Sequence, residues 1–218
     1  MFRQILYTQW KWTRLAILLG VLAGFALPLL SVQHISVPAP SHWEAREMLG
    51  RLQAWGVLYP ALATTLAVVV AMASWAADHR GRHVYALSLP AQRWYYALLR
   101  FQAGAILLIA PVLTLWVGAM VASSMITIPP GLHAYPTILA VRFALALFVA
   151  YAAFFAISAG TARTAGYILG ILAVLVAAQL LAKAADVEFS LLGWLWDRLS
   201  LWPGPLDVFT GRWMLIDV

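Results

Sequence analysis

The run ALLRFQAGAILLIAPVLTLWVGAMVAS occupies residues 97–123 and carries one charged side chain, Arg100. A helix needs about 20 mainly apolar residues to cross the hydrocarbon core of a bilayer, and this run exceeds that length. The whole chain is similarly apolar, since 64% of its 218 residues are hydrophobic and 10% are charged. Soluble domains carry roughly 25% charged residues. The sequence therefore predicts an integral membrane protein.

Four more apolar runs flank this one, at residues 15–32, 55–77, 137–159 and 166–182, the last of them short for a full crossing. We therefore predict an all-α polytopic membrane protein with about five transmembrane helices, in a single transmembrane domain over residues 1–218. Residues 1–13 are predicted to form an amphipathic interfacial helix, because Ile5, Leu6, Trp10 and Thr13 fall near one face. A short surface helix is expected within 41–53.

The segment 189–202 is rich in tryptophan but short, and Asp197 and Arg198 lie in its middle. A charge at the centre of a spanning helix costs about 3 kcal/mol on insertion scales. We therefore expect an outer-surface helical segment near the carboxyl terminus, which lies in the interface or re-enters the membrane without crossing it. The stretch 213–216 is too short to cross a bilayer.

Charge sets the predicted orientation. With the amino terminus in the cytoplasm, the inner segments hold one of the eight acids, Asp78, and the outer segments hold the others. The inner basic residues are Arg3, Lys11, Arg14, Arg80, Arg82, Arg93, Arg100 and Arg163. The positive-inside rule then predicts a cytoplasmic amino terminus and an external carboxyl terminus. The membrane itself is expected to be a bacterial cytoplasmic (inner) membrane. The net charge of +6 is thus attributed to topology, and no nucleic-acid partner is expected.

The linker between the second and third spans reads DHRGRHVYALSLPAQR over residues 78–93. Asp78 is expected to cap or end the second span, and Gly81 permits a turn. Pro90 is expected to begin the next helical segment, where a missing N–H is tolerated. On composition alone this is an ordinary positive-inside loop followed by an aromatic girdle.

The order of its residues indicates more. An acid, a glycine, a Tyr-Ala-Leu-Ser-Leu-Pro core and then Arg93 and Arg100 resemble the first cytoplasmic loop of type-2 ATP-binding-cassette (ABC) permeases, over about residues 78–100. In that family the loop is a coupling helix. The resemblance implies a half-transporter that pairs with a second permease copy or a sister permease and sits on cytoplasmic ABC ATPase subunits. The residues that it assigns to the ATPase contact are Asp78, Arg80, Arg82, Leu87, Leu89, Pro90 and Arg93.

ATP would bind to the partner subunit, because the chain has no Gly-x-x-x-x-Gly-Lys-Ser/Thr loop to cradle phosphates. We expect this chain to bind no cofactor, to catalyse no reaction itself and to move a hydrophobic or amphipathic substrate. Family members usually have a sixth span that returns the carboxyl terminus to the cytoplasm, and none is found here. Either the sequence stops early or this is a reduced member. A reduced member would be a non-transporting structural subunit of a larger membrane complex.

Polar residues offer few other sites. Arg142, near the outer end of the fourth span, either extends to the headgroups or lines a translocation path. His79 and His83 have metal-ligand spacing but no third ligand nearby. A membrane enzyme acting on lipids would need clustered acids or histidines, and the inner face offers Asp78, His79 and His83. Cysteine is absent, which excludes disulfides and thiolate sites.

Two Gly-x-x-x-Gly pairs, Gly20 with Gly24 and Gly166 with Gly170, have the spacing that allows two membrane helices to approach closely. Apolar helices rich in glycine and alanine produce this spacing by chance. The pairs are therefore interpreted either as ordinary packing or as a dimer interface.

Overall fold

The structure is a computed structural model, and it describes residues 1–33, 49–50, 52–80, 92–126, 128, 131–160, 167, 170–171, 174–175, 191–201, 203–210 and 213–217. The chain divides into two compact units. The first comprises Met1–Phe155 with Arg212–Val218, and the second comprises Ala156–Gly211. The single-domain assignment stays a prediction.

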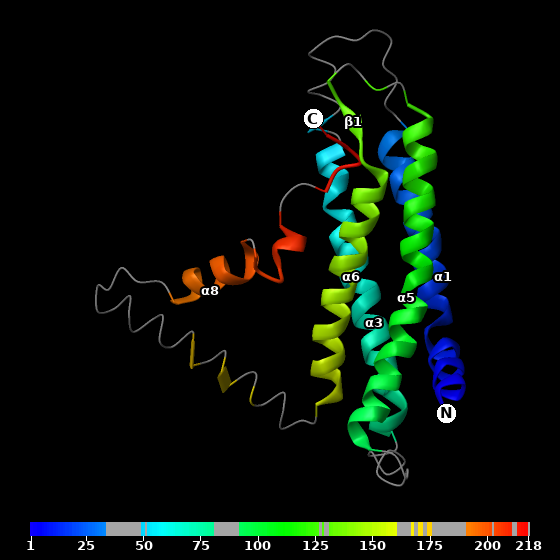
Figure 1. Ribbon diagram of the computed structural model, residues 1–218, viewed down its shortest axis with the longest axis vertical. Coiled ribbons are helices and arrows are strands. Elements are labelled where there is room, and N and C mark those ends of the chain that lie inside the picture. Colours follow the sequence, from blue (N-terminus) through cyan, green and yellow to red (C-terminus); the bar gives the residue numbers. More distant parts are fainter. Residues whose placement is uncertain are drawn as a thin grey trace. The chain divides into compact units, whose positions relative to one another are not determined.

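Four long helices build the first unit and run side by side along the long axis (Figure 1). They are α1 (Phe2–Val32), α3 (Leu58–Arg80), α5 (Arg93–Ser124) and α6 (Pro136–Ala159), the last of which continues into the second unit. Among the described residues, four stretches are long and apolar enough to span a membrane: Phe2–Val32, Leu52–Ala76, Trp94–Ser124 and Pro136–Ala159. The prediction of an all-α integral membrane protein is confirmed at this level. The predicted span 166–182 and the surface helix at 41–53 fall largely outside the described residues.

The helices alternate in direction. α1 and α5 run away from the end at which the amino terminus lies, here called the amino end, and α3 and α6 run back toward it (Figure 1). The opposite end of the bundle is called the far end. It carries the link between α5 and α6 and also the carboxyl-terminal residues of the first unit.

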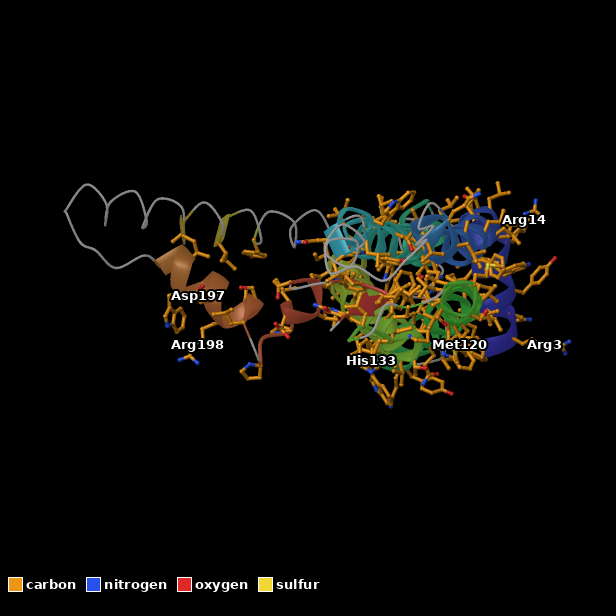
Figure 2. All side chains as sticks on the ribbon, turned by 90° about the horizontal axis from the view of Figure 1, so that it is seen from above. Arg3, Arg14, Met120, His133, Asp197 and Arg198 are labelled. Carbon is orange, nitrogen blue, oxygen red and sulfur yellow. The ribbon has the colours of Figure 1, made fainter. Side chains whose placement is uncertain are left out.

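The amino-terminal stretch lies across the bundle. A view along the long axis shows the ribbon between Arg3 and Arg14 running crosswise, whereas the rest of α1 follows the axis (Figures 1 and 2). The structure has one continuous helix where a separate amino-terminal helix was expected, and an interfacial location of its first turns stays a prediction. The backbone stays helical from Phe2 to Val32, because no Gly or Pro interrupts it before Gly20.

Glycines bring α1 against its neighbours. A Cβ atom on Gly20 would lie 2.7 Å from the side chain of Leu66 in α3, and one on Gly24 would lie 3.0 Å from the Pro111 carbonyl oxygen in α5. On α5, a Cβ atom on Gly118 would lie 2.6 Å from the Phe25 carbonyl oxygen. The Gly20–Gly24 pair thus packs within the chain, so its interpretation as a dimer interface is wrong.

A small sheet closes the far end. Strand β1 (His133–Ala134) pairs antiparallel with β2 (Ile216–Asp217), with His133 opposite Asp217 and Ala134 opposite Ile216. Gly131 precedes β1 with φ of +90°, a conformation that glycine adopts without strain. These two strands were not predicted from the sequence, because their four residues are too few to show period-two alternation.

In the second unit, α8 (Leu191–Ser200) is followed by a 3₁₀ turn, η1 (Asp207–Phe209). The Leu206 N–H donates to the Leu199 carbonyl at 2.8 Å, which folds the chain back on the end of α8. The Arg198 guanidinium lies 5.7 Å from the centre of the Trp194 ring. The helix expected within 189–202 is present, and its location at an outer membrane surface stays a prediction.

Candidate coupling site at the amino end of the bundle

The predicted coupling loop joins α3 to α5. α3 ends and α5 begins at the amino end, so the segment between them connects the two helices there (Figure 1). Asp78 and Arg80 belong to the last turn of α3, and Arg93 is the first residue of α5. The remaining predicted contact residues lie outside the described residues: Arg82, Leu87, Leu89 and Pro90. His83 also lies outside them.

Both ends of this linker differ slightly from expectation. α3 continues two residues past Asp78, up to the position before Gly81, and helices commonly end next to a glycine. α5 starts at Arg93 and not at Pro90, because Gln92 is extended with φ of −61° and ψ of 135°. The Tyr96 N–H donates to the Gln92 carbonyl at 3.1 Å and closes the first helical turn.

Arg100 is the buried cation of this end. Two turns into α5 and 8% exposed, it donates hydrogen bonds to the Ser74 carbonyl of α3 and to the Tyr96 hydroxyl. Its guanidinium lies 4.7 Å from the Tyr96 ring centre and 5.3 Å from that of Trp75. Cation–π contacts and carbonyl acceptors stabilise a cation that burial would otherwise disfavour. Arg100 therefore joins the end of α3 to the start of α5.

The crosswise stretch of α1 is attached to the same residue. The Gln9 amide donates to the Arg100 carbonyl at 3.1 Å, and the Thr13 hydroxyl donates to the Gln9 carbonyl at 2.8 Å. Gln9 and Thr13 are buried, whereas Arg3 and Arg14 point outward from this stretch (Figure 2). The crosswise stretch thus presents basic side chains outward, and its Gln9 side chain attaches it to α5.

An aromatic layer joins α6 to these contacts. The Phe101 ring stacks on Tyr151 at 5.1 Å and meets Phe155 edge-on at 5.3 Å, and Phe155 packs against Trp75 at 5.2 Å. The Tyr151 hydroxyl donates to the Phe101 carbonyl at 3.2 Å. A Cβ atom on Gly104 would overlap that hydroxyl, so the small residue permits the close approach.

Sequence reasoning missed part of this cluster. Hydropathy singles out Arg142 as the clear ionisable residue inside a span, yet Arg100 is the more deeply buried of the two. Its signal was available, because Arg100 lies inside the run 97–123 and an ionisable residue there is a functional candidate by default. Gln9, Ser74 and Trp75 carried no comparable signal, since their relation to Arg100 arises from helix packing.

Arg142 lies toward the far end of α6, with its guanidinium 5.0 Å from the centre of the Trp213 ring. Trp213 in turn stacks on Tyr59 of α3 at 6.4 Å. The residue thus contacts the carboxyl-terminal segment of the first unit. Its role in a translocation path stays a prediction.

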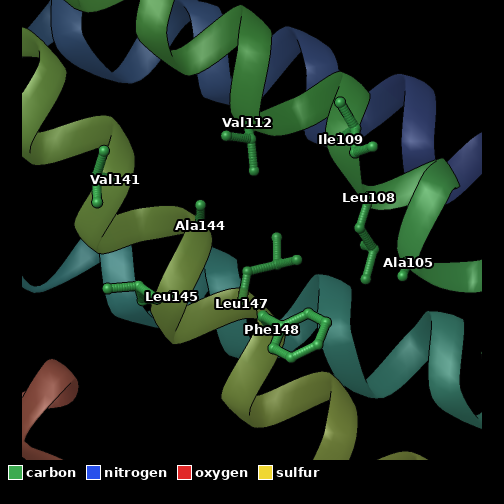
Figure 3. A pocket seen from close by; sticks show the side chains of 9 residues that line it. All are labelled: Ala105, Leu108, Ile109, Val112, Val141, Ala144, Leu145, Leu147 and Phe148. Atoms are coloured by element: carbon green, nitrogen blue, oxygen red, sulfur yellow. The ribbon is translucent and has the colours of Figure 1, made fainter. Parts of the chain in front are cut away.

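An apolar groove of about 350 Å³ lies between α5 and α6, within the first unit. The side chains of the two helices face one another across it (Figure 3). Its lining residues are Ala105, Leu108, Ile109, Val112, Val141, Ala144, Leu145, Leu147 and Phe148. Every lining residue is apolar, so the groove suits hydrocarbon and offers no group for polar chemistry.

Among the described residues, no three His, Asp or Glu side chains gather as a metal site would require. The His79–His83 pair falls where side chains are not described.

Comparison of the chain with protein-family models, with curated proteins and with solved structures finds no match.

Proposed function

We propose that this chain is the membrane-spanning permease subunit of an ATP-driven transporter of the type-2 ABC kind, in which the 78–93 loop binds a separate cytoplasmic ATPase. The observation that carries the proposal is the Arg100 cluster. It connects the interfacial stretch of α1, the end of α3 and the start of α5 at the base of that loop. Contacts of this kind support the transmission of a displacement of the loop into α3 and α5.

In this mechanism, closure of two ATPase subunits displaces the loop. Its two ends continue directly into α3 and α5, so both helices receive the displacement. Because Arg100 bonds to the Ser74 carbonyl and accepts the Gln9 amide on its own carbonyl, the two helices and the interfacial stretch move together. A second permease copy or a sister permease would complete the path. The apolar groove between α5 and α6 favours a hydrophobic or amphipathic substrate.

The proposal is tested by gentle detergent purification of the tagged chain, mass spectrometry of bound proteins and an ATPase assay on the same sample. We expect a stoichiometric ATPase whose activity falls about tenfold or more with Pro90→Ala or Arg93→Glu, since coupling sets turnover in such machines. Arg198→Gln, an exposed arginine of α8 outside the loop, is the matched control and should retain activity. A stable assembly that holds no ATPase would instead identify a structural subunit.

We further propose five spans, with the amino terminus in the cytoplasm and Asp217 outside. α6 runs toward the amino end, whereas Trp213 to Asp217 lie at the far end, paired with the link between α5 and α6. If the bundle spans a bilayer, the chain between these two points must cross it an odd number of times. The predicted span at 166–182 would supply one crossing.

This topology is checked with single cysteines, because the chain contains none. A membrane-impermeant maleimide applied to intact cells should label His133→Cys and Asp217→Cys, and should label Arg3→Cys after permeabilisation. His133 and Arg3 are exposed, which makes both sites reactive. Equal labelling of Arg3→Cys and Asp217→Cys before permeabilisation would contradict five spans while leaving the four-helix bundle in place.

A further inference from the structure

The segment Trp213–Asp217 is bound to the far end of the bundle through its backbone. β2 pairs with β1, and the Tyr135 N–H donates to the Leu215 carbonyl at 2.8 Å. Leu215 and Ile216 are 1% and 0% exposed, so the segment is inserted among the helix ends. It thereby connects the link between α5 and α6 to the interior of the bundle.

The Trp213 side chain contacts two helices, α3 and α6, that are far apart in the sequence. One side of its indole stacks on Tyr59 of α3 with the ring planes 11° apart, and the Arg142 guanidinium of α6 lies 5.0 Å from the ring centre. Its carbonyl oxygen lies 2.6 Å from where a Cβ atom on Gly56 would be, so that residue must stay small. The far ends of α3 and α6 are therefore held together through one side chain.

Burial of the Trp213 indole N–H makes an unfavourable contribution to the free energy of the bound segment. The Trp213 Nε1–H is buried and has no hydrogen-bond partner among the described residues. A buried donor without a partner loses its hydration with no compensation, and water would restore that hydration if the segment lifted. The paired strands are two residues long, and so short a pairing is marginal by itself. The strand pairing by itself therefore holds the segment weakly, and the burial of its side chains supplies the rest of the attachment.

We propose that Trp213–Asp217 is a clasp that closes the far end of the bundle and must release before the ends of α3 and α6 separate. This inference rests on the proposed function, because the release is driven by turnover of the ATPase. The clasp acts as a gate on the side opposite the coupling loop. Arg142 serves as the cation that holds Trp213 in the closed position.

The test introduces cysteines at the paired positions His133 and Asp217. Directly opposed residues of antiparallel strands lie about 4.5–5.5 Å apart at Cα, within the roughly 4.4–6.8 Å that a disulfide spans. The double variant His133→Cys/Asp217→Cys is purified with its ATPase, and ATP turnover is measured reduced, oxidised and after dithiothreitol. We expect oxidation to lower turnover about tenfold or more and dithiothreitol to restore it. The two single variants, treated identically, should show no loss.

The outcomes separate the two proposals. An ATPase that runs equally fast with the disulfide formed would overturn the clasp and leave the permease assignment standing. A purified chain that carries no ATPase before oxidant is added would overturn the permease assignment and, with it, the gating role. Failure of the two cysteines to cross-link at all would show that β1 and β2 are not paired, which also overturns the clasp.

Discussion

Replacing Gly118 with valine is expected to prevent α1 and α5 from packing and to leave little folded protein. A Cβ atom at this position would lie 2.6 Å from the Phe25 carbonyl oxygen and 3.0 Å from its Cα. Both are backbone atoms, so the clash is relieved by separating two helices along their length and not by rotating a side chain. Overpacking in a core typically costs about 1–3 kcal/mol, and a backbone clash lies at or above the upper end of that range.

The measurement is the yield of monodisperse protein in detergent, together with its thermal unfolding. A graded series makes the result specific. Gly20→Ala should be milder, because its Cβ atom would meet the flexible end of the Leu66 side chain, and Gly50→Ala should be neutral, because nothing lies within 4 Å. If Gly118→Val behaved like Gly50→Ala, the close approach of α1 to α5 would be wrong.

Replacing Arg100 with methionine is expected to produce the second large effect. The substitution removes hydrogen bonds to the Ser74 carbonyl and the Tyr96 hydroxyl and two cation–π contacts. Hydrogen bonds to a charged group contribute about 1.5–3 kcal/mol each. Methionine also removes the cost of burying the charge, so the loss is smaller than the sum of these contributions. We expect the free energy of unfolding to fall by about 3 kcal/mol. Thermal unfolding in detergent measures this loss.

Two companion variants separate stability from coupling. Arg100→Lys keeps the charge but loses the planar fork, and should lie between wild type and Arg100→Met in unfolding temperature. Gln9→Leu breaks the bond to the Arg100 carbonyl while leaving the guanidinium contacts intact, so it should lower ATPase coupling more than it lowers stability. An Arg100→Met chain with unchanged unfolding temperature would contradict the structural role of the cluster.

The helical spans were predictable because each is a local property of the chain. The run 97–123 became Arg93–Ser124, and 137–159 became Pro136–Ala159. In a bilayer every backbone group must be paired within its own segment, so an apolar run of sufficient length becomes a helix whatever surrounds it. The crosswise direction of the first turns agrees with the amphipathic pattern of residues 1–13, in which Ile5, Leu6, Trp10 and Thr13 fall near one face.

The candidate site was less predictable. The sequence marks the loop 78–93 and places Arg100 among the basic residues near it, but it does not show that the Arg100 side chain reaches the Ser74 carbonyl across 26 positions. Nor does it show that Gly20 and Gly24 face partners in the same chain. A glycine pair predicts close packing equally well for any helix, and the identity of the partner depends on the order in which the helices pack.

The sequence by itself determined the membrane class, four of the helices and their approximate ends, because hydropathy and length act residue by residue along the chain. Only the tertiary structure decided which polar groups meet: Gln9 with Arg100, and Arg142 with Trp213. The insertion of the stretch from Trp213 to Asp217 among the helix ends is likewise visible only in the tertiary structure. Such pairings depend on distances between segments remote in sequence, and those distances are fixed by side-chain packing after the helices have formed.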